Sequence, residues 1–574
     1  MDELQFGFYA ATGNVNVSKI NKNWKRLSCA TFSVCYNPLP KFEDDKLFFE
    51  TEDRIVLLDG VIFNKDELMR SYPSVSWQDR FLILIETNPA SFMDELRGSF
   101  SGIVYSKRNN TLVAYTNHSG EKTVYYTQCE EGFVLASHVD FLQHVLHENG
   151  KKLSPCIDAN YEMLLTGSIL HGKTPFESVF RITAGKVALF SETSVRLDSY
   201  HVFRNIPEHE LTLDECIEKA DVLFRQAVDR IFRKSKEYGY QAECDLSGGL
   251  DSRMATWVAH DLGYSDILNI CYCVEGNLDH TISKKIANDL GNPYLFIPMD
   301  ASVLTDVDRK TRLSGGQVLY CLSTGALKAM EIIKEKNIGL CCTGLLGEIQ
   351  NAYWTEGDKH TTPNYISNRK SYFYELTIPE EYSREYDNFE QMNLYEYSTN
   401  LFMLSALTRQ QYTEVVSPFV DVDYLDFAYK IPLKWRKNYQ FIQAYMCKKY
   451  PQAAKYVWQT MLMPVDKHYK RELYLPKYSV LIRSYVARAI NKMCRKFKLH
   501  SGVIKLDDMN PIDVWIKTDN KARELLQEYC LNNFELVRDD LLRERLETMY
   551  HTTKLPTDLV QIVYVLSVYR NYLL

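Results

Sequence analysis

At 574 residues the chain is too long for one hydrophobic core, and a usual domain size of about 150 residues predicts roughly two to four structural units. Its 45% hydrophobic and 25% charged residues are typical of an ordinary globular protein. A net charge of −7 and a pI of about 6.1 exclude a general attraction to nucleic acid or to anionic membranes, so any phosphate group must bind at a local site.

The chain shows no sign of a membrane or secretory segment. No apolar run reaches the roughly 18 residues that a spanning helix needs, and the first residues, Met-Asp-Glu-Leu-Gln-Phe, do not resemble a signal peptide. The 14 cysteines are scattered, and pairs such as Cys271/Cys273 lack the spacing of zinc ligands. We expect a cytoplasmic protein with reduced thiols and with neither nucleic acid nor membrane as a partner.

The first 200 residues contain short β-like runs that turn residues separate, at 54–58, 102–105, 111–115 and 123–126. This pattern predicts a strand-rich α+β unit over residues 1–205. Thr212-Leu213-Asp214-Glu215 then has the form of a capping box, which predicts the start of a helix. The second unit is therefore expected to span residues 206–574.

From residue 240 the pattern alternates between strands and helices. Strands are expected at 240–246, 267–274, 294–297 and 340–343. Between them, Met254, Trp257, Val258 and Leu262 fall at helical spacing, and further helices are expected at about 279–290 and 326–336. Gly263 is well placed to end the first of these helices. Such alternation predicts a parallel sheet, which binds ligands at the carboxyl ends of its strands.

The last 150 residues or so are predicted to be mostly helical. Within them, residues 481–505 carry seven lysines and arginines among apolar residues. The segment is typical either of a basic helix for an acidic partner or of the solvated face of an ordinary helix.

A glycine-containing loop joins the first of these strands to the helix that follows it. Two glycines allow the backbone to approach an anion, and the amides of the loop meet at the positive end of the helix. Asp251 would repel phosphate unless a magnesium ion lay between them, since hard cations prefer oxygen ligands. The loop reads Ser247-Gly248-Gly249-Leu250-Asp251-Ser252. It predicts a site for ATP and Mg²⁺.

The loop resembles the pyrophosphate loop of the asparagine synthetase family, which includes β-lactam synthetases and lasso-peptide cyclases. Residues 59–64, Asp-Gly-Val-Ile-Phe-Asn, resemble the family's N-G-E-I-Y-N segment, and residues 414–421, Glu-Val-Val-Ser-Pro-Phe-Val-Asp, resemble its E-x-R-x-P-F-L-D segment. With weaker similarities at 97–100 and 119–122, the resemblance covers nearly the whole chain.

The resemblance implies an N-terminal αββα sandwich of the Ntn-hydrolase type and a C-terminal PP-loop (adenine nucleotide alpha hydrolase-like) domain with a parallel sheet and a helical end. The implied reaction is adenylation of a carboxylate, with pyrophosphate released, followed by attack of an amine. The substrates would be a small-molecule or peptide carboxylate and an amine, and a homodimer is one assembly to consider. The residues expected to bind ATP or pyrophosphate are Leu246, Ser247, Gly248, Gly249, Asp251, Ser252, Val274 and Gly344.

The resemblance also suggests roles for three charged residues. Glu348 takes the place of the second magnesium carboxylate beside Asp251, although a solvated glutamate is the alternative. Glu414 matches the glutamate that positions the amine, and an ion pair between helices is its alternative. A lysine is expected to stabilise the pyrophosphate leaving group. Lys467 is favoured over Lys470, and either could be a surface lysine.

Several positions depart from the family pattern. Glutaminases of this class use a cysteine at position 2, where this chain has Asp2. Asp59 and Val61 replace the Asn and Glu of the glutamine pocket, so we expect no glutaminase activity. Leu345 stands where a polar residue faces the acceptor, and Val416 replaces the arginine of the E-x-R string.

Three functions are compatible with the sequence. The first is an ATP-dependent amide-forming ligase that uses ammonia or an amine, and the second is an intramolecular amide cyclase. The third is a non-catalytic nucleotide-binding or interaction protein. The intact loop favours the first two, because a protein without catalytic activity would not need Asp251.

Overall fold

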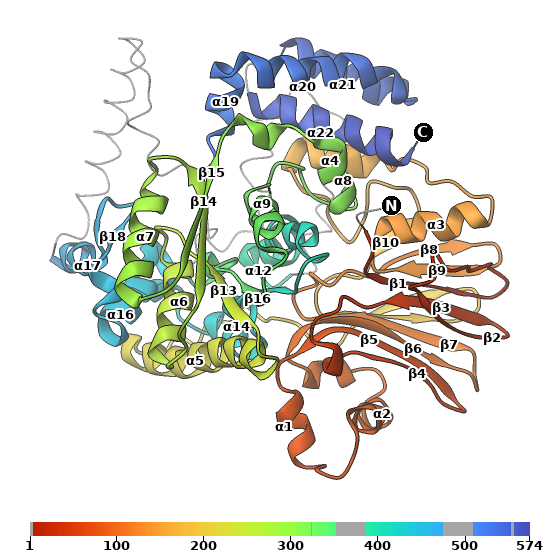
Figure 1. Cartoon of the computed structure of the whole chain (residues 1–574), viewed down its shortest axis with the longest axis horizontal. Helices are drawn as coiled ribbons and strands as arrows, with labels where there is room; N and C mark the ends of the chain where they lie inside the picture. The colour runs from red at the N-terminus through yellow and green to blue at the C-terminus, as the bar shows by residue number, and fades with distance from the viewer. Residues whose placement is uncertain (1–3, 323, 352–385, 475–508, 553–555, 574) are drawn as a thin grey trace.

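The computed structural model describes residues 4–322, 324–351, 386–474, 509–552 and 556–573. Two antiparallel sheets lie face to face on one side of the molecule, and a parallel sheet lies on the other side (Figure 1). The predicted basic segment at 481–505 lies outside the described residues.

The N-terminal part is a sandwich of two antiparallel six-stranded sheets. The first sheet has the order β10 (Val179–Arg181), β8 (Tyr125–Cys129), β9 (Gly132–Ala136), β1 (Gly7–Thr12), β3 (Phe32–Asn37) and β2 (Lys25–Cys29). The second has the order β12 (Val195–Ser199), β11 (Lys186–Phe190), β7 (Thr111–Thr116), β6 (Gly98–Ser106), β5 (Arg54–Ile62) and β4 (Leu47–Glu50).

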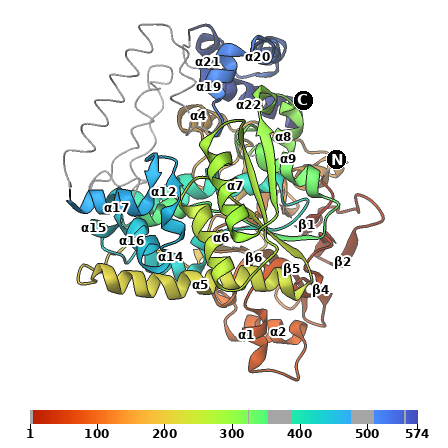
Figure 2. The same cartoon turned by 60° about the vertical axis from the view of Figure 1, so that its left-hand side comes forward.

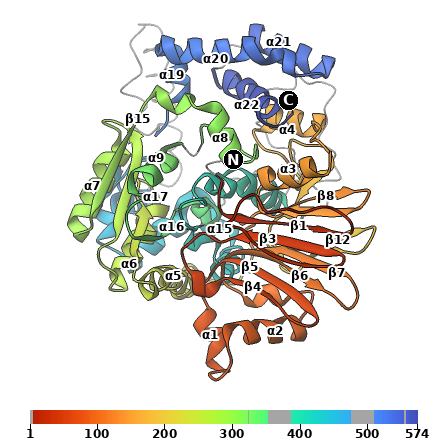
Figure 3. The same ribbon diagram turned by 45° about the vertical axis from the view of Figure 1, so that its right-hand side comes forward.

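Alternation along β5 explains how the layers form. Ile55 and Leu57 pack against the other sheet, whereas Val56 and Leu58 pack against helix α2 (Trp77–Thr87). Helix α1 (Lys65–Arg70) lies on the same outer side, and α3 (Val139–Glu148) and α4 (Ile157–Thr166) cover the first sheet (Figure 3). The expected αββα sandwich is confirmed.

The second part is built on a parallel sheet of five strands. Its order is β15 (Tyr294–Met299), β14 (Leu268–Val274), β13 (Gln241–Asp245), β16 (Ile338–Cys342) and β17 (Val415–Val416). Helices lie on both sides of the sheet: α6 and α7 lie next to each other on one face in Figure 2, and α9 packs against the opposite face. They include α5 (Leu213–Glu237), α6 (Asp251–Asp261), α7 (Leu278–Leu290), α8 (Val307–Leu313) and α9 (Thr324–Ile333).

Apolar side chains alternate between the two faces of this sheet. Cys342 packs with Phe224 of α5, whereas its neighbour Cys341 packs on the opposite side with Leu327 of α9. Both faces are therefore buried, as parallel sheets require. The predicted parallel-sheet domain is confirmed.

Several predicted details of the helices and strands are also confirmed. Thr212 and Glu215 form the expected capping box at the start of α5. Gly263 has a φ of 88° just after α6, a conformation that glycine adopts without strain. The short strand β17 was not predicted, since two residues carry no periodic signal. Helix α9 ends at Ile333, three residues before the expected position.

The rest of the chain is largely helical, as expected. Residues 386–474 contain α12 (Phe389–Asn393), α13 (Thr399–Leu401), α14 (Val422–Ala428), α15 (Leu433–Arg436), α16 (Gln440–Lys449) and α17 (Val465–Tyr474), with the short strands β18 (Val457–Trp458) and β19 (Met463–Pro464). The C-terminal helices are α19 (Ile512–Thr518), α20 (Asn520–Asn533), α21 (Asp540–Thr552) and α22 (Pro556–Tyr572). A search of the described residues for a helix apolar and long enough to span a membrane finds none.

Helix α22 connects the two parts of the molecule, because it packs against α4 of the sandwich and against α8 of the second part. The division of the chain at 205/206 stays a prediction.

Candidate functional site

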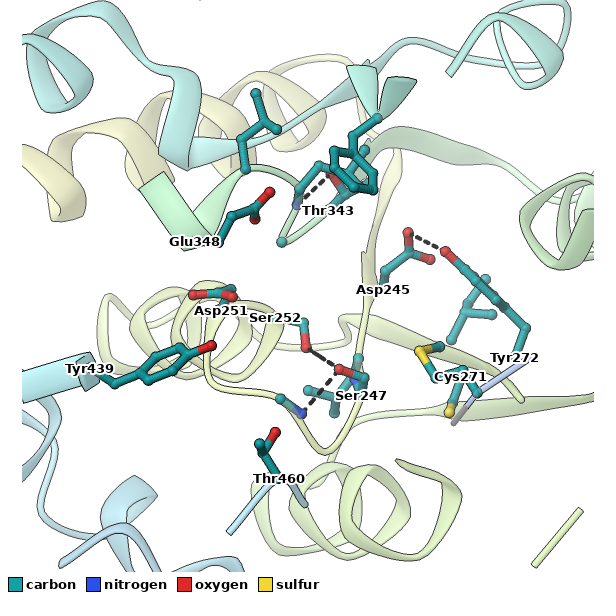
Figure 4. A pocket seen from close by; sticks show the side chains of 18 residues that line it. Asp245, Ser247, Asp251, Ser252, Cys271, Tyr272, Thr343, Glu348, Tyr439 and Thr460 are labelled. Atoms are coloured by element: carbon teal, nitrogen blue, oxygen red, sulfur yellow. Dashed lines mark hydrogen bonds between the residues drawn. The ribbon is translucent and has the colours of Figure 1, made fainter. Parts of the chain in front are cut away.

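The loop after β13 lies at the carboxyl end of that strand and at the N-terminus of α6. Its shape is held by two serines: the Ser247 amide donates to Ser252 Oγ at 3.0 Å, and the Gly249 amide donates to Ser247 Oγ at 3.1 Å (Figure 4). The serine hydroxyls therefore line a compact turn at the positive end of a helix, which is where an anion binds most readily.

A second loop, which follows β16, packs tightly against the first. A Cβ added to Gly344 would lie 2.6 Å from the Ser252 amide nitrogen, and a Cβ on Gly347 would lie 2.3 Å from Asp251 Cγ. Only glycine leaves room for this approach. The two loops are thereby held together, and Glu348 is brought to the side of Asp251.

Asp251 and Glu348 line the same cavity, from the first and the second loop respectively (Figure 4). Burial raises the pKa of Asp251 to about 7, and the charge of Glu348 adds to the effect. Burial also raises the pKa of Glu348. The two buried acids form a donor set of hard oxygen atoms, which is the set that magnesium prefers. These residues fit a divalent cation.

Asp251 is held by a short chain of hydrogen bonds that the sequence did not predict. Gln350 Nε2 donates to Asp251 Oδ1 at 3.3 Å, and the hydroxyl of Tyr424 donates to Gln350 Oε1 at 2.6 Å. Tyr424 is 1% exposed, so this chain links the loop to the core of α14.

The two loops open into a cavity of about 670 Å³, within the usual range for small-molecule sites. Its lining consists of Asp245, Leu246, Ser247, Gly249, Asp251, Ser252, Ile270, Cys271, Tyr272, Thr343, Gly344, Leu345, Leu346, Glu348, Phe402, Tyr439, Thr460 and Met509. Among these described lining residues there are three acids and no lysine, arginine or histidine. A polyphosphate would therefore need a bound cation here.

Most of the residues predicted to bind the nucleotide line this cavity, but Gly248 and Val274 do not. The Gly248 amide donates to Asp279 Oδ1 at 2.7 Å, which turns it toward α7. Val274 lies at the end of β14, where its amide donates to the carbonyl of Met509. Strand β14 instead contributes Ile270, Cys271 and Tyr272.

The structure does not bring Glu414 or Lys467 to the cavity. Glu414 is fully buried just before β17, and its Oε1 lies 3.1 Å from the Nζ of Lys122 in the sandwich. Lys467 and Lys470 are exposed residues of α17. Their proposed roles stay predictions.

A buried arginine supports the first loop from behind. Arg253 is 0% exposed, and its Nη2 donates to the carbonyl of Gly248 at 2.9 Å and to that of Val457 at 2.7 Å. Burial lowers the pKa of this arginine to about 9. The position of Arg253 directly after the loop is visible in the sequence. The carbonyl groups that it contacts about 200 residues further along the chain, such as that of Val457, cannot be identified from the sequence.

The segment that resembles a glutamine pocket contains its own buried ion cluster. Lys122 Nζ lies 2.9 Å from Asp59 Oδ2, and the hydroxyl of Tyr36 donates to Asp59 Oδ1 at 2.7 Å. The cavity beside Asp59 and Lys122 measures about 30 Å³. That is room for a water molecule rather than for a glutamine side chain.

Comparisons with known proteins agree with the sequence resemblance. Residues 42–144 match the model of a glutamine amidotransferase domain. Over 269 residues the chain is 26% identical to "Asparagine synthetase [glutamine-hydrolyzing] 1" of Lotus japonicus, a match that covers 44% of this chain and 40% of that protein.

Two solved structures are also similar to parts of the chain. The "allosteric regulatory enzyme of purine biosynthesis" is 9% identical, with 51% of this chain and 75% of that chain covered and a TM-score of 0.25. The NH3-dependent NAD synthetase of Campylobacter jejuni is 14% identical, with coverages of 32% and 80% and a TM-score of 0.19. TM-scores this low support no conclusion about this chain.

Proposed function

Because the chain belongs to the asparagine synthetase family, we propose that it is an ATP-dependent amide-forming ligase that releases AMP and pyrophosphate. A carboxylate oxygen of the substrate attacks the α-phosphorus of ATP, and pyrophosphate leaves with the electron pair of the broken P–O bond. An amine or ammonia then attacks the carbonyl carbon of the acyl-adenylate. AMP leaves, and the nitrogen loses a proton as the amide forms.

The observation that carries this proposal is the position of the two carboxylates beside the loop. Ser247 and Ser252 offer hydroxyls at the helix N-terminus, and Asp251 and Glu348 line the same cavity. Asp251 and Glu348 would hold magnesium, which when bound neutralises the charge of the phosphates. The loop binds the departing pyrophosphate, and the cavity excludes water from the activated carboxyl group.

The carboxylate substrate meets an apolar wall in this proposal. Leu345 and Phe402 line the cavity and pack against an apolar cluster that contains Leu346 and Met403. A leucine cannot relay a proton from the incoming amine. The assignments of Glu414 to the amine and of Lys467 to the leaving group rest on the sequence motif alone.

The N-terminal domain has no glutaminase activity in this proposal. The buried ion pair between Lys122 and Asp59 involves the segment that resembles the family's glutamine pocket, and the space beside it measures about 30 Å³, which supports this part of the proposal. The nitrogen therefore comes from free ammonia or from an amine, which includes an amine of the same substrate in the cyclase variant.

A non-catalytic nucleotide-binding protein is the second candidate. The absence of a cationic side chain among the described lining residues favours it, since a leaving pyrophosphate is usually stabilised by one.

The two candidates differ in whether ATP is cleaved. We would incubate the full chain with ATP, Mg²⁺ and panels of carboxylates and amines, and measure AMP and pyrophosphate. The ligase should form both products in equal amounts, and Asp251→Ala should abolish them while Asp66→Ala, an exposed control on α1, does not. Binding of ATP without AMP under every condition would favour the second candidate. Formation of glutamate from glutamine that is lost in Asp59→Ala would contradict the absence of glutaminase activity.

A further inference from the structure

Two histidines and an aspartate meet at one corner of the sandwich, away from the ATP cavity. Asp94 belongs to the 3-10 helix Phe92–Glu95, His118 follows β7, and His201 follows β12. His118 Nε2 lies 3.2 Å from Asp94 Oδ1, and His201 Nδ1 lies 2.9 Å from the same oxygen. Three segments that are distant in sequence thus bring one nitrogen or oxygen donor each within 4.8 Å of one another.

These donor distances fit a metal ion. Zinc binds imidazole nitrogen and carboxylate oxygen at about 2.0–2.2 Å, so neighbouring donors of a tetrahedral site lie about 3.3 Å apart. The observed 2.9 Å and 3.2 Å are close to that value. The side chain of Asp94 is 43% exposed and that of His118 is 3% exposed, so the cluster is open to solvent on the aspartate side only. Water could complete the coordination there.

A fourth residue supports one of the histidines from behind. The second nitrogen of His201, Nε2, lies 3.4 Å from Asp426 Oδ1 of helix α14. Histidine ligands commonly contact a carboxylate through the ring nitrogen that does not bind the metal, and this contact fixes their orientation. Burial alone would lower the pKa of His201, but Asp426 and Asp94 together raise it to about 9, so a bound metal ion would have to displace the proton of this imidazole.

We propose that Asp94, His118 and His201 bind a transition metal ion, zinc in the first instance, with Asp426 orienting His201. Asp94, His118 and His201 belong to the sandwich, whereas Asp426 belongs to the second part of the chain. The ion would therefore stabilise the contact between the two parts. It is separate from the magnesium proposed at the ATP cavity, because none of these four residues lines that cavity.

A second cluster of possible ligands in the described residues does not carry this inference. Glu243, Asp245 and Cys341 also come close together. However, Arg409 Nη1 lies 3.1 Å from Asp245 Oδ2 and 2.9 Å from Cys341 Sγ. The guanidinium already supplies the positive charge that a metal would bring, so this cluster is an internal ion pair.

The test uses cobalt as a spectroscopic substitute for zinc in the full chain after treatment with a chelator. We expect one equivalent of Co²⁺ to give the visible bands of a four-coordinate site without a thiolate charge-transfer band. His118→Ala and His201→Ala should each lose this signal. His147→Ala, which changes an exposed histidine of α3, and Asp251→Ala should keep it. Asp426→Asn should retain the site but weaken its affinity about 10- to 100-fold.

Two results would overturn the proposal. The first is that the folded wild-type chain binds neither Co²⁺ nor Zn²⁺ at one equivalent. The cluster would then be an ion pair of protonated His201 with Asp94 and Asp426. The second is a cobalt signal that survives in His201→Ala or that shows thiolate bands. Neither result depends on formation of AMP, so failure of this proposal is distinguishable from failure of the proposed ligase function.

Discussion

Gly347 and Asp251 are in such close contact that no other residue fits at position 347. A Cβ there would lie 2.3 Å from Asp251 Cγ and 2.5 Å from both Asp251 Cβ and Oδ1. The site thus depends on the absence of a side chain in one loop as much as on the carboxylate in the other. Because Glu348 follows directly, a shift of either loop would change the separation of the two carboxylates.

Gly347→Ala should therefore displace Asp251 and weaken the magnesium-dependent binding of ATP by at least tenfold. The reason is steric, since the methyl group would overlap the carboxylate carbon rather than the end of a flexible chain. Calorimetric titration with a non-hydrolysable ATP analogue in Mg²⁺ measures the effect. Gly276→Ala is a suitable control, because a Cβ there meets nothing within 4 Å, although its φ of 79° adds some strain. Unchanged affinity in Gly347→Ala would show that the two loops move independently.

Gln350→Leu should also weaken this binding, because it removes the side chain that donates to Asp251. Hydrogen bonds to charged groups contribute about 1.5–3 kcal/mol, and the length of 3.3 Å places this one at the low end, which corresponds to about a tenfold loss. The same titration in EDTA should show no difference between variant and wild type.

Tyr424→Phe provides a second measurement of the same chain of contacts. It leaves Gln350 in place but removes the hydroxyl that holds it at 2.6 Å, so a smaller loss is expected. Equal affinities of wild type and Gln350→Leu would mean that Asp251 needs no such support.

The acid stability of the chain should depend on Asp140, a fully buried residue of α3. Burial alone would raise its pKa, but His138 and Arg312 together lower it from 3.8 to about 2. A lowered carboxyl pKa stabilises the fold above the unfolded-state value near 4, and that stabilisation is lost as the pH falls toward 2. A shift of about two pKa units corresponds to roughly 2.5 kcal/mol.

Thermal unfolding of wild type and Asp140→Asn between pH 6 and pH 2 measures this contribution. The variant should be less stable at pH 6, and the difference should shrink below pH 4. Asp53→Asn, which changes an exposed pair with Arg108, is the control and should have little effect. A difference between Asp140→Asn and wild type that stays constant down to pH 2 would contradict the expectation.

The sequence predicted those parts of the site that lie within one short segment. The loop from Ser247 to Ser252 is local, and its chemistry follows from six consecutive residues. Tyr439 and Thr460 reach the same cavity from segments about 200 residues further along the chain, and no local pattern marks them. The family resemblance placed the backbone near Val274 at the nucleotide, whereas in the structure Ile270 and Tyr272 are the residues of β14 that line the cavity.

Much of the fold could also be predicted, because strands and helices leave local patterns in the sequence. The short β-like runs before residue 200 indicated a strand-rich unit and the strand–helix repeat after residue 240 indicated the parallel sheet, whereas the αββα sandwich followed from the family resemblance. Ion pairs between the two parts have no such signal. Lys122 and Glu414 are 292 residues apart in sequence, so the resemblance to a catalytic motif was the only guide to Glu414.

Lys122 should prove one of the residues most important for stability. Its Nζ lies between Asp59 Oδ2 at 2.9 Å and Glu414 Oε1 at 3.1 Å, and all three side chains are less than 10% exposed. Lys122→Met would leave two buried carboxylates without their shared cation, which typically costs about 3–5 kcal/mol. Arg54→Ala, which breaks the more exposed pair with Glu86, should cost less than about 1 kcal/mol.

Chemical denaturation of Lys122→Met and of the triple variant Lys122→Met/Asp59→Asn/Glu414→Gln separates charge from packing. The triple variant should recover part of the lost stability, because its buried groups are neutral and an isolated buried charge is the main cost. If it is no more stable than Lys122→Met, the lysine acts through its packing instead. In that case the ion pairs of Lys122 with Asp59 and Glu414 would not be what joins the sandwich to strand β17.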